Sequence, residues 1–316
     1  MSNETFLWIF SRGIELGLIV VCLLPLRALF RRKIPRLFSY VLWIALPTNI
    51  VYRFVTGILL KKLPRVADFV HRLPKVVIEE GTVRIMKWCW IGGTAVVVLW
   101  LTVSYIRFLR KLIGSIRLQK DVYLADRIRA PFTLGLICPK IYLPVSLQEE
   151  YYEYVILHER VHISRKDVWM KYLAVGFLGV FWFQPLLWFA CYLFMNDMEE
   201  ACDETVIRKE TPEFREGYAR ALVEVSFQTG KVRGAAVGYG NGAIKSRITN
   251  IMNYKQVRLR GYLIAILMCV VFVIVSVAVS WQVPKIVHGI KYEEYMNEAM
   301  SVQHTGVGKE FVTEEK

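Results

Sequence analysis

His158-Glu159-Arg160-Val161-His162 is the stretch of the chain from which fold and function are best predicted. A helix places residues four apart on one face, so the two imidazoles can reach one metal ion. Glu159 would lie beside that ion and could take a proton from an attacking water molecule. The same pattern also fits two solvent-facing histidines on an amphipathic helix. The five residues therefore predict a metal site only together with a further ligand.

The segment Glu199-Glu200-Ala201-Cys202-Asp203 offers that ligand. The HExxH pattern is typical of zinc peptidases, and a catalytic zinc needs three protein ligands and one open position. We predict that zinc (Zn2+, one ion per chain) binds His158, His162 and Glu199. Glu159 would be the general base, which later protonates the leaving amine. The two segments together therefore predict a complete zinc site.

Two further acids are expected to hold the ligands in place. Asp203 lies four residues after Glu199, so we expect it to bind a zinc-bound histidine by its other ring N–H. Asp167 could orient a ligand in the same way, or could be a helix-end charge beside basic neighbours. Glu200 points about 100° away from Glu199 and is the less suitable ligand. The six cysteines show no CxxC pairing, and we expect small buried side chains.

The chain is 55% hydrophobic with a mean hydropathy of +0.36, which is more apolar than ordinary soluble domains. The excess lies in runs close to the roughly 20 residues that a helix needs to cross a bilayer. Four such runs are Phe6–Leu26, Leu37–Leu60, Trp88–Leu109 and Gly261–Gln282. We therefore predict a mostly α, polytopic membrane protein. Its expected parts are three transmembrane helices in 1–112, a soluble domain in 113–260, a fourth transmembrane helix in 261–282 and a short extracellular tail in 283–316.

The placement of basic residues predicts how the chain is oriented in the membrane. The net charge is +14, and basic clusters follow the first and third apolar runs and precede the last one. Cytoplasmic loops are enriched in Lys and Arg, so these regions are expected inside and both termini outside. The loop Lys61–Lys87 disagrees, because it has seven basic residues against three acids and must lie outside. No basic–aromatic cluster forms a groove, so we expect contact with anionic membrane lipids and no direct nucleic acid binding.

A fifth apolar run, Tyr172–Phe194, lies between the two halves of the predicted site. If it crossed the bilayer once, the histidines and Glu199 would lie about 30 Å apart, whereas zinc–ligand bonds are about 2 Å. A single span would therefore exclude the zinc site. Pro185 interrupts the run, so we predict a hairpin of two short helices at the membrane. A site inside the bilayer is less favoured, because the charged residues around the histidines would be costly in lipid.

The soluble region is expected to combine a short hairpin with several helices. Prolines, a glycine and alternating apolar residues predict a hairpin over Ala130–Pro144. Its exposed edge could hold an extended peptide by strand addition, or could be scaffold only. The candidate substrate-binding residues are Phe132, Thr133, Leu134 and Gly135. Helices are expected over Gln148–Ile163, Met195–Arg208 and Pro212–Gln228, with a glycine-rich segment at Thr229–Ala243 and a basic amphipathic one at Ile244–Tyr254.

In these motifs the chain resembles the integral-membrane antirepressor metallopeptidases of the BlaR/MecR type. The pattern is carried by Pro131-Phe-Thr-Leu-Gly135-Leu, the HERVH stretch, Asp167, Pro185, the EEACD segment and the basic Ile244-Lys-Ser-Arg-Ile248. The resemblance implies a cytoplasmic α+β zinc domain of the gluzincin type flanked by four membrane helices. It implies cleavage of a cytoplasmic repressor protein, or of the chain itself near Thr229–Ala243, after a signal from outside. A homodimer would suit such a receptor.

One departure from the family concerns the sensor. The well-known sensors continue into an extracellular penicillin-binding domain with a serine nucleophile, but the residues after Gln282 contain no S-x-x-K. Direct acylation by a β-lactam is therefore not expected, and the stimulus would come through a partner, the tail, the Lys61–Lys87 loop or the membrane. Two alternatives stay open. They are a membrane peptidase of quality control or processing, and a catalytically silent signalling or scaffold protein that keeps zinc as a structural element.

Overall fold

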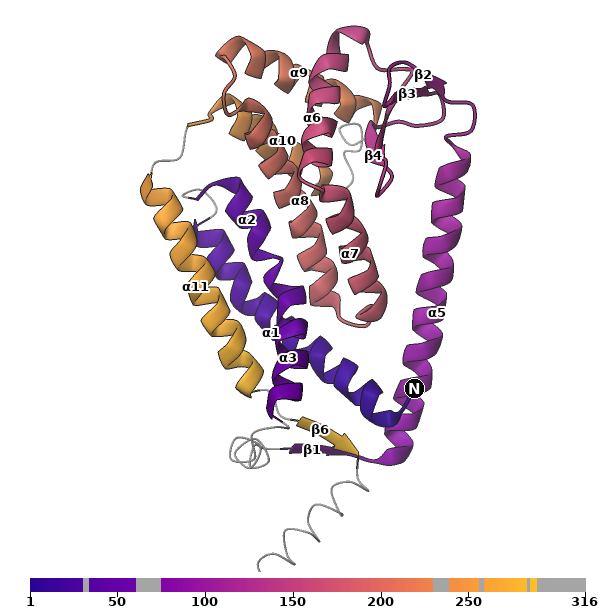
Figure 1. The fold of residues 1–316 in the computed structure, drawn as a ribbon, viewed down its shortest axis with the longest axis vertical. Helices are drawn as coiled ribbons and strands as arrows, with labels where there is room; N and C mark the ends of the chain where they lie inside the picture. Colours follow the sequence, from indigo (N-terminus) through magenta and orange to yellow (C-terminus); the bar gives the residue numbers. More distant parts are fainter. Residues whose placement is uncertain (31–33, 61–74, 230–238, 256–258, 283–284, 289–316) are drawn as a thin grey trace, which may run out of the picture. The chain divides into compact units, whose positions relative to one another are not determined.

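The structure, a computed structural model, describes residues 1–30, 34–60, 75–229, 239–255, 259–282 and 285–288. The described chain is mostly helical, with one four-stranded sheet and one two-stranded pair (Figure 1). It divides into two compact units. Unit 1 comprises 1–19, 46–95 and 274–316, and unit 2 comprises 20–45 and 96–273. The predicted site and the predicted soluble domain belong to unit 2.

Three of the described helices are long and apolar enough to cross a membrane. They are α1 (Asn3–Phe30), α5 (Glu80–Arg110) and the Leu259–Ser276 part of α11 (Leu259–Gln282). They correspond to the first, third and fourth expected spans. The second expected span is not one helix.

This second apolar run is divided into α2 (Arg36–Leu42) and α3 (Ala45–Leu60). At the junction, the amides of Trp43 and Ile44 donate to the carbonyls three residues back, at 3.3 and 3.0 Å. Such tighter bonds end a helical segment and turn the chain. Whether α3 crosses a membrane stays a prediction.

In unit 1, strands from two distant parts of the chain pair in parallel. They are β1 (Lys75–Ile78), just before α5, and β6 (Lys285–His288), which follows α11. If α5 and α11 each cross a membrane, the chain returns to the side from which it started, so the pairing agrees with two crossings. It also agrees with the expectation that the Lys61–Lys87 loop and the tail share one side. Most of that loop and of the tail lies outside the described residues.

The sheet of unit 2 has the order β2-β3-β5-β4. Its strands are β2 (Ile116–Arg117), β3 (Val122–Ala125), β4 (Phe132–Leu134) and β5 (Lys140–Pro144). The expected hairpin is present, since β4 and β5 pair antiparallel. In its turn Gly135 has φ +109°, and a Cβ there would lie 2.7 Å from the carbonyl oxygen of Cys138, so glycine is required. β4 is an edge strand of the described sheet.

Helices cover the site region of unit 2 (Figure 1). They are the short 3-10 helix η1 (Glu149–Tyr151), α6 (Tyr152–Ser164), α7 (Asp167–Val180), α8 (Pro185–Ile207), α9 (Pro212–Gln228) and α10 (Tyr239–Met252). Buried Val122, Ile141 and Leu143 of the sheet pack with Leu147 and with Val155 of α6. Thr211 caps α9 by accepting from the amide of Phe214 at 3.3 Å, as expected for a Thr-Pro helix start. The sheet thus fixes the helix that carries the two histidines.

The fifth apolar run is two helices, α7 and the first part of α8, as the site geometry required. Pro185 is the first residue of α8, a position where proline costs no hydrogen bond. One expectation is corrected: the second arm of the hairpin and the helix with the EEACD segment are a single continuous α8. Neither glycine nor proline occurs around the expected boundary between Phe194 and Met195, so the helix continues through it. Residues 230–238 of the glycine-rich segment lie outside the described residues.

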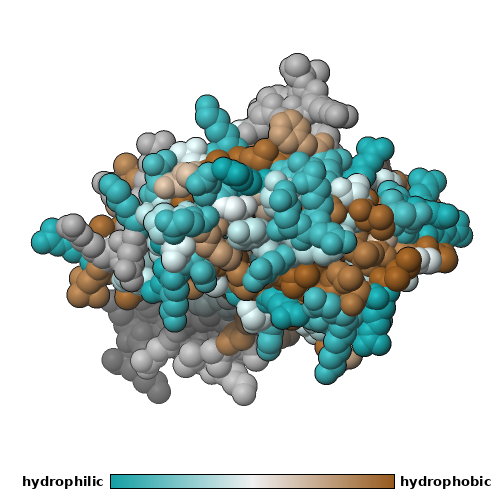
Figure 2. All heavy atoms as spheres, turned by 90° about the horizontal axis from the view of Figure 1, so that it is seen from above, coloured by the Kyte–Doolittle hydropathy of each residue, from teal (hydrophilic) through white to brown (hydrophobic). Residues whose placement is uncertain are grey.

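Figure 2 looks down on the molecule from above in the view of Figure 1, where α6 and α9 lie. Hydrophilic side chains cover much of the face that is visible there. The α7–α8 hairpin differs, because several large apolar side chains on it are exposed. These side chains are Trp169, Tyr172, Leu173, Trp188, Phe189 and Tyr192.

Candidate metal centre and active site

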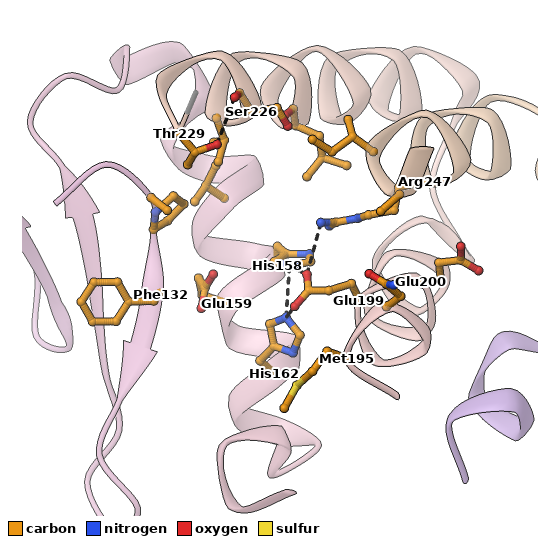
Figure 3. Close-up of a pocket in the computed structure, with 18 of the residues that line it drawn as sticks. Phe132, His158, Glu159, His162, Met195, Glu199, Glu200, Ser226, Thr229 and Arg247 are labelled. Carbon is orange, nitrogen blue, oxygen red and sulfur yellow. Dashed lines mark hydrogen bonds and ion pairs between the residues drawn. The ribbon is translucent and has the colours of Figure 1, made fainter. Parts of the chain in front are cut away.

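Two packed helices, α6 and α8, bring the three predicted ligands together (Figure 3). The Nε2 atoms of His158 and His162 lie 3.1 Å apart. The Glu199 carboxylate faces both of them, with one oxygen 3.3 Å from Nε2 of His158 and the other 3.4 Å from Nε2 of His162. Both histidines are buried. Segments nearly forty residues apart in the sequence therefore converge on one point.

These separations suit one tetrahedral metal ion. Ligand atoms bound to zinc at 2.0–2.2 Å in tetrahedral geometry are about 3.3–3.6 Å apart. The separation of 3.1 Å between the two Nε2 atoms is close to this range, and so are the 3.3 and 3.4 Å from these nitrogens to the two different oxygens of Glu199. The donor set of two imidazoles and one carboxylate is also the kind that a catalytic zinc uses. The residues present therefore fit a zinc ion without rearrangement of the two helices.

The other ring nitrogen of His162 is held by Asp167, as one of the two readings of Asp167 anticipated. Nδ1 of His162 lies 2.7 Å from Oδ2 of Asp167, which is fully buried. A proton on Nδ1 leaves the lone pair of Nε2 free for a metal. The turn at Lys166, which has the left-handed φ of 60°, lets α7 begin directly after α6. Asp167 can thereby face a histidine only five residues earlier.

His158 is held through Tyr218, a residue of α9 that the sequence did not single out. Nδ1 of His158 lies 2.7 Å from the Tyr218 hydroxyl, which donates to Asp203 at 2.6 Å. Asp203 itself is 3.5 Å from that nitrogen. Asp203 thus faces the expected ring nitrogen, and the Tyr218 hydroxyl bonds to both groups beside this contact. Burial and the Asp203 carboxylate raise the pKa of Tyr218, so it keeps the proton that it donates.

Arg247 of α10 completes this network and was also missed. Its Nε and Nη2 donate to the two oxygens of Asp203 at 2.7 and 2.8 Å, a bidentate pair. Its Nη1 lies 3.2 Å from Oε2 of Glu199 (Figure 3). The resemblance included the basic segment that contains Arg247 but gave it no role. Glu200 points elsewhere, as expected, and accepts from Ser246 at 2.9 Å.

The electrostatics of the site favour positive charge between the two helices. Burial lowers the pKa of His158, but Cys202 and Glu199 outweigh it and raise that pKa to about 10. Burial also lowers the pKa of His162, and Glu199 and Asp167 raise it to about 12. Burial raises the pKa of Glu199, yet His162 and Arg247 hold it well below its usual range. Without a metal, the two imidazoles therefore hold protons beside an ionised Glu199 carboxylate.

Cys202 gives a second possible set of ligand atoms with His158 and His162, all within 4.8 Å of one another. However, its Sγ lies 3.5 Å from Nδ1 of His158, the nitrogen that already faces Tyr218. The Nε2 atoms of both histidines face Glu199 instead. The geometry therefore favours Glu199 as the third ligand. Cys202 is fully buried, as expected of the cysteines, but Cys89 and Cys138 are exposed, so that expectation is wrong for those two.

Glu159 lies between the histidines and the edge strand β4 (Figure 3). It is buried and accepts a hydrogen bond from the Thr133 hydroxyl at 2.8 Å. A cleft of about 990 Å³ opens here, and Phe132, Thr133 and Leu134 line it together with the predicted ligands. Gly135 is not among its lining residues and serves the turn after β4. The structure thus places three of the four predicted strand residues at the site.

Apolar helices of membrane length and an HExxH pair that converges with a downstream glutamate define the class of membrane-bound metallopeptidases. The comparison with known families agrees, because the family described as BlaR1 peptidase M56 matches residues 7–251. The chain belongs to this family, which implies a signal-transducing membrane metallopeptidase.

Individual relatives match over shorter stretches. The Methicillin resistance mecR1 protein of Staphylococcus aureus is 28% identical over 138 residues, which cover 41% of this chain and 24% of the relative. The Regulatory protein BlaR1 of Bacillus licheniformis is 27% identical over 150 residues, covering 45% and 25%. The chain thus matches about a quarter of the length of these relatives.

Proposed function

We propose that this chain is a zinc endopeptidase of signal transduction that cleaves a cytoplasmic transcriptional repressor, itself, or both. The observation that carries the proposal is the convergence of His158, His162 and Glu199 at separations that suit one zinc ion. A zinc ion at this point would act as a Lewis acid on water and on the peptide carbonyl.

Glu159 would carry out the proton transfers. The Thr133 hydroxyl holds its carboxylate beside the cleft, where it can take a proton from water and pass it to the leaving amine. β4 is an edge strand, so an extended substrate can add to it through main-chain hydrogen bonds. A peptide bound in this way would run past Glu159.

We further propose a multi-pass protein whose peptidase domain is cytoplasmic. Support comes from the three membrane-length helices, from the basic segments that flank them and from the pairing of β1 with β6. The exposed apolar side chains of the α7–α8 hairpin support contact of this hairpin with lipid. The cleft would then lie close to the membrane surface.

The substrate class follows from the family resemblance and from the relatives. Their names include a methicillin resistance protein and a regulatory protein, which supports a role in a regulatory response. A repressor in the cytoplasm and the chain itself are the two proposed substrates. A homodimer is a further prediction.

The test compares Glu159→Gln with Glu153→Gln, an exposed glutamate on the same helix, in the full chain reconstituted in lipid nanodiscs. Zinc content, the masses of self-cleavage fragments and the cleavage of candidate repressors are measured. We expect about one zinc per chain in all three proteins, and proteolysis in all but Glu159→Gln.

Proteolysis that survives in Glu159→Gln would contradict the proposed chemistry. Zinc binding without proteolysis of any substrate by the unaltered chain would favour the silent scaffold. Cleavage of misfolded membrane proteins with repressors left intact would favour a quality-control peptidase.

A further inference from the structure

We propose that the end of α1 and helix α2 form a positioning element of the metal site. The proposal rests on the proposed function and adds to it how the site is held and adjusted. All residues involved lie in unit 2. The element is defined by Arg27 of α1, Arg36 and Tyr40 of α2, and Trp43 directly after α2.

α8 carries acids on two faces, and each face has its own partners. Glu199 and Asp203 are four apart and face the histidines, Tyr218 and Arg247. Asp197, Glu200 and Glu204 follow the spacing i, i+3, i+7, so they form a second stripe on the helix. α2 packs against α8, and the positioning element contacts every member of this second stripe.

The contact at Asp197 lies two residues before Glu199. Nε and Nη2 of Arg27 donate to its two oxygens at 2.7 and 2.6 Å, and Nε1 of Trp43 donates to it at 2.8 Å. Arg27 and Asp197 are both buried. A buried ion pair lowers stability unless its two groups are well aligned and fully hydrogen-bonded. The Arg27–Asp197 pair therefore restricts the position of α8.

Arg36 makes the next two contacts on the same stripe. Its backbone amide donates to Glu204 at 2.6 Å, and its Nη1 lies 3.3 Å from Glu200. Its Nη2 also donates to Asn250 of α10 at 3.0 Å. One residue at the start of α2 therefore links α8 to the helix that carries Arg247.

The other half of the metal site is contacted by Tyr40. Its hydroxyl donates to Oδ1 of Asp167 at 3.1 Å, while Oδ2 of the same carboxylate faces Nδ1 of His162. The Arg165 guanidinium stacks over the Tyr40 ring, 5.0 Å from its centre. The positioning element thus contacts Asp167, which orients His162. It also contacts α8, which carries Glu199. A displacement of this element would change the separation of His162 and Glu199.

This arrangement offers a route from a membrane helix to the site. α1 is one continuous helix of membrane length, and Arg27 lies in its last turn. Apolar side chains could have packed α2 against α8 at lower cost, whereas polar contacts specify one register. Through Arg27, the positioning element therefore connects the end of α1 to the helix that carries Glu199.

The experiment uses Tyr40→Phe combined with Trp43→Phe, which removes two hydrogen bonds and leaves an aromatic ring, smaller at position 43, at both positions. The matched control is Tyr123→Phe with Trp88→Phe, since Tyr123 lies in β3 and Trp88 is exposed on α5. Zinc affinity is measured by chelator competition in the full chain in nanodiscs. The visible spectrum of Co2+ bound in place of zinc reports the ligand geometry.

We expect about three- to tenfold weaker zinc binding and an altered Co2+ spectrum in the Tyr40/Trp43 variant, with no change in the control. Hydrogen exchange of α8 in the metal-free protein should be faster in this variant only. Unchanged affinity, spectrum and exchange would overturn the positioning role, while leaving the peptidase proposal intact. If the unaltered chain binds neither zinc nor Co2+, the proposed function fails and this inference fails with it.

Discussion

The pairs His158/His162 and Glu199/Asp203 have the same spacing on two helices, but they behave differently. The two histidines converge, with their Nε2 atoms 3.1 Å apart. The two acids share Arg247 but face different ring nitrogens. Glu199 lies against the Nε2 atoms of both histidines, while Asp203 lies on the Nδ1 side of His158 with Tyr218. A spacing of four places both side chains on one face, and the elements packed on that face decide what each one binds. The helices α9 and α10 thus divide the second pair into one proposed ligand and one support.

Replacement of Glu199 should have the largest effect. We expect Glu199→Ala to weaken zinc binding more than about a hundredfold, beyond the 10–100-fold cost of losing an outer partner. Cys202→Ser should keep about one zinc per chain, because its Sγ lies on the Nδ1 side of His158. Metal content after dialysis against a chelator measures both. If Glu199→Ala kept its zinc and Cys202→Ser lost it, Cys202 would be the third ligand in place of Glu199.

Removal of the Asp203 charge should have an intermediate effect on zinc affinity, because Asp203 holds the ligands in place and is not itself a proposed ligand. Asp203→Asn weakens the bidentate pair with Arg247 and leaves a partly buried guanidinium, which keeps its contact with Glu199. We expect a loss of about 3 kcal/mol in unfolding free energy, the low end for a broken buried pair, because 19% of the Arg247 side chain is exposed. Zinc affinity should fall about tenfold. Denaturant unfolding and chelator competition measure the two effects.

The control for this change is Asp121→Asn. Asp121 lies 3.5 Å from Arg160 in an exposed ion pair, so its loss should cost less than about 1 kcal/mol. Equal losses for the two variants would mean that Asp203 has no special part in the site.

The smallest effect is expected at the turn that brings Asp167 to His162. Lys166 is exposed and has a left-handed backbone, which glycine adopts without strain. Lys166→Gly should therefore raise the unfolding free energy by about 1 kcal/mol, with zinc affinity unchanged. Thermal unfolding of the metal-free and zinc-loaded chain measures this. A loss of stability would show that the lysine side chain contributes more than the turn costs.

Local spacing predicted a large part of the site. Both histidines, Glu159 and Glu199 follow from helical periodicity, and the need to bring them together predicted the hairpin at Pro185. The residues that local spacing did not predict were missed for a physical reason. Arg247 and Tyr218 reach the site from α10 and α9, and nothing in their neighbouring residues marks them as partners of Asp203. Contacts between distant segments depend on packing, which periodicity does not encode.

The division of the second apolar run has the same origin. Hydropathy treats Leu37–Leu60 as uniform, but Tyr40 and Trp43 bind acids more than a hundred residues away. These long-range bonds accompany a turn between α2 and α3 that composition alone does not show. Conversely, no breaker separates the apolar and acidic parts of α8, and the sequence-based boundary at Met195 imposed a division that the helix does not have.

By itself, the sequence determined the chemistry available to this protein: two imidazoles, a general base and a carboxylate at helical spacings, in a chain with membrane-length apolar helices. Only the tertiary structure decided how these groups are held. It brought the Tyr218 hydroxyl to both His158 and Asp203, brought Arg247 to Glu199, and joined α2 to α8 through buried polar contacts. The physical reason is range, because helical periodicity acts over a few residues. The hydrogen bonds that fix a ligand can come from any segment that folding brings within 3 Å.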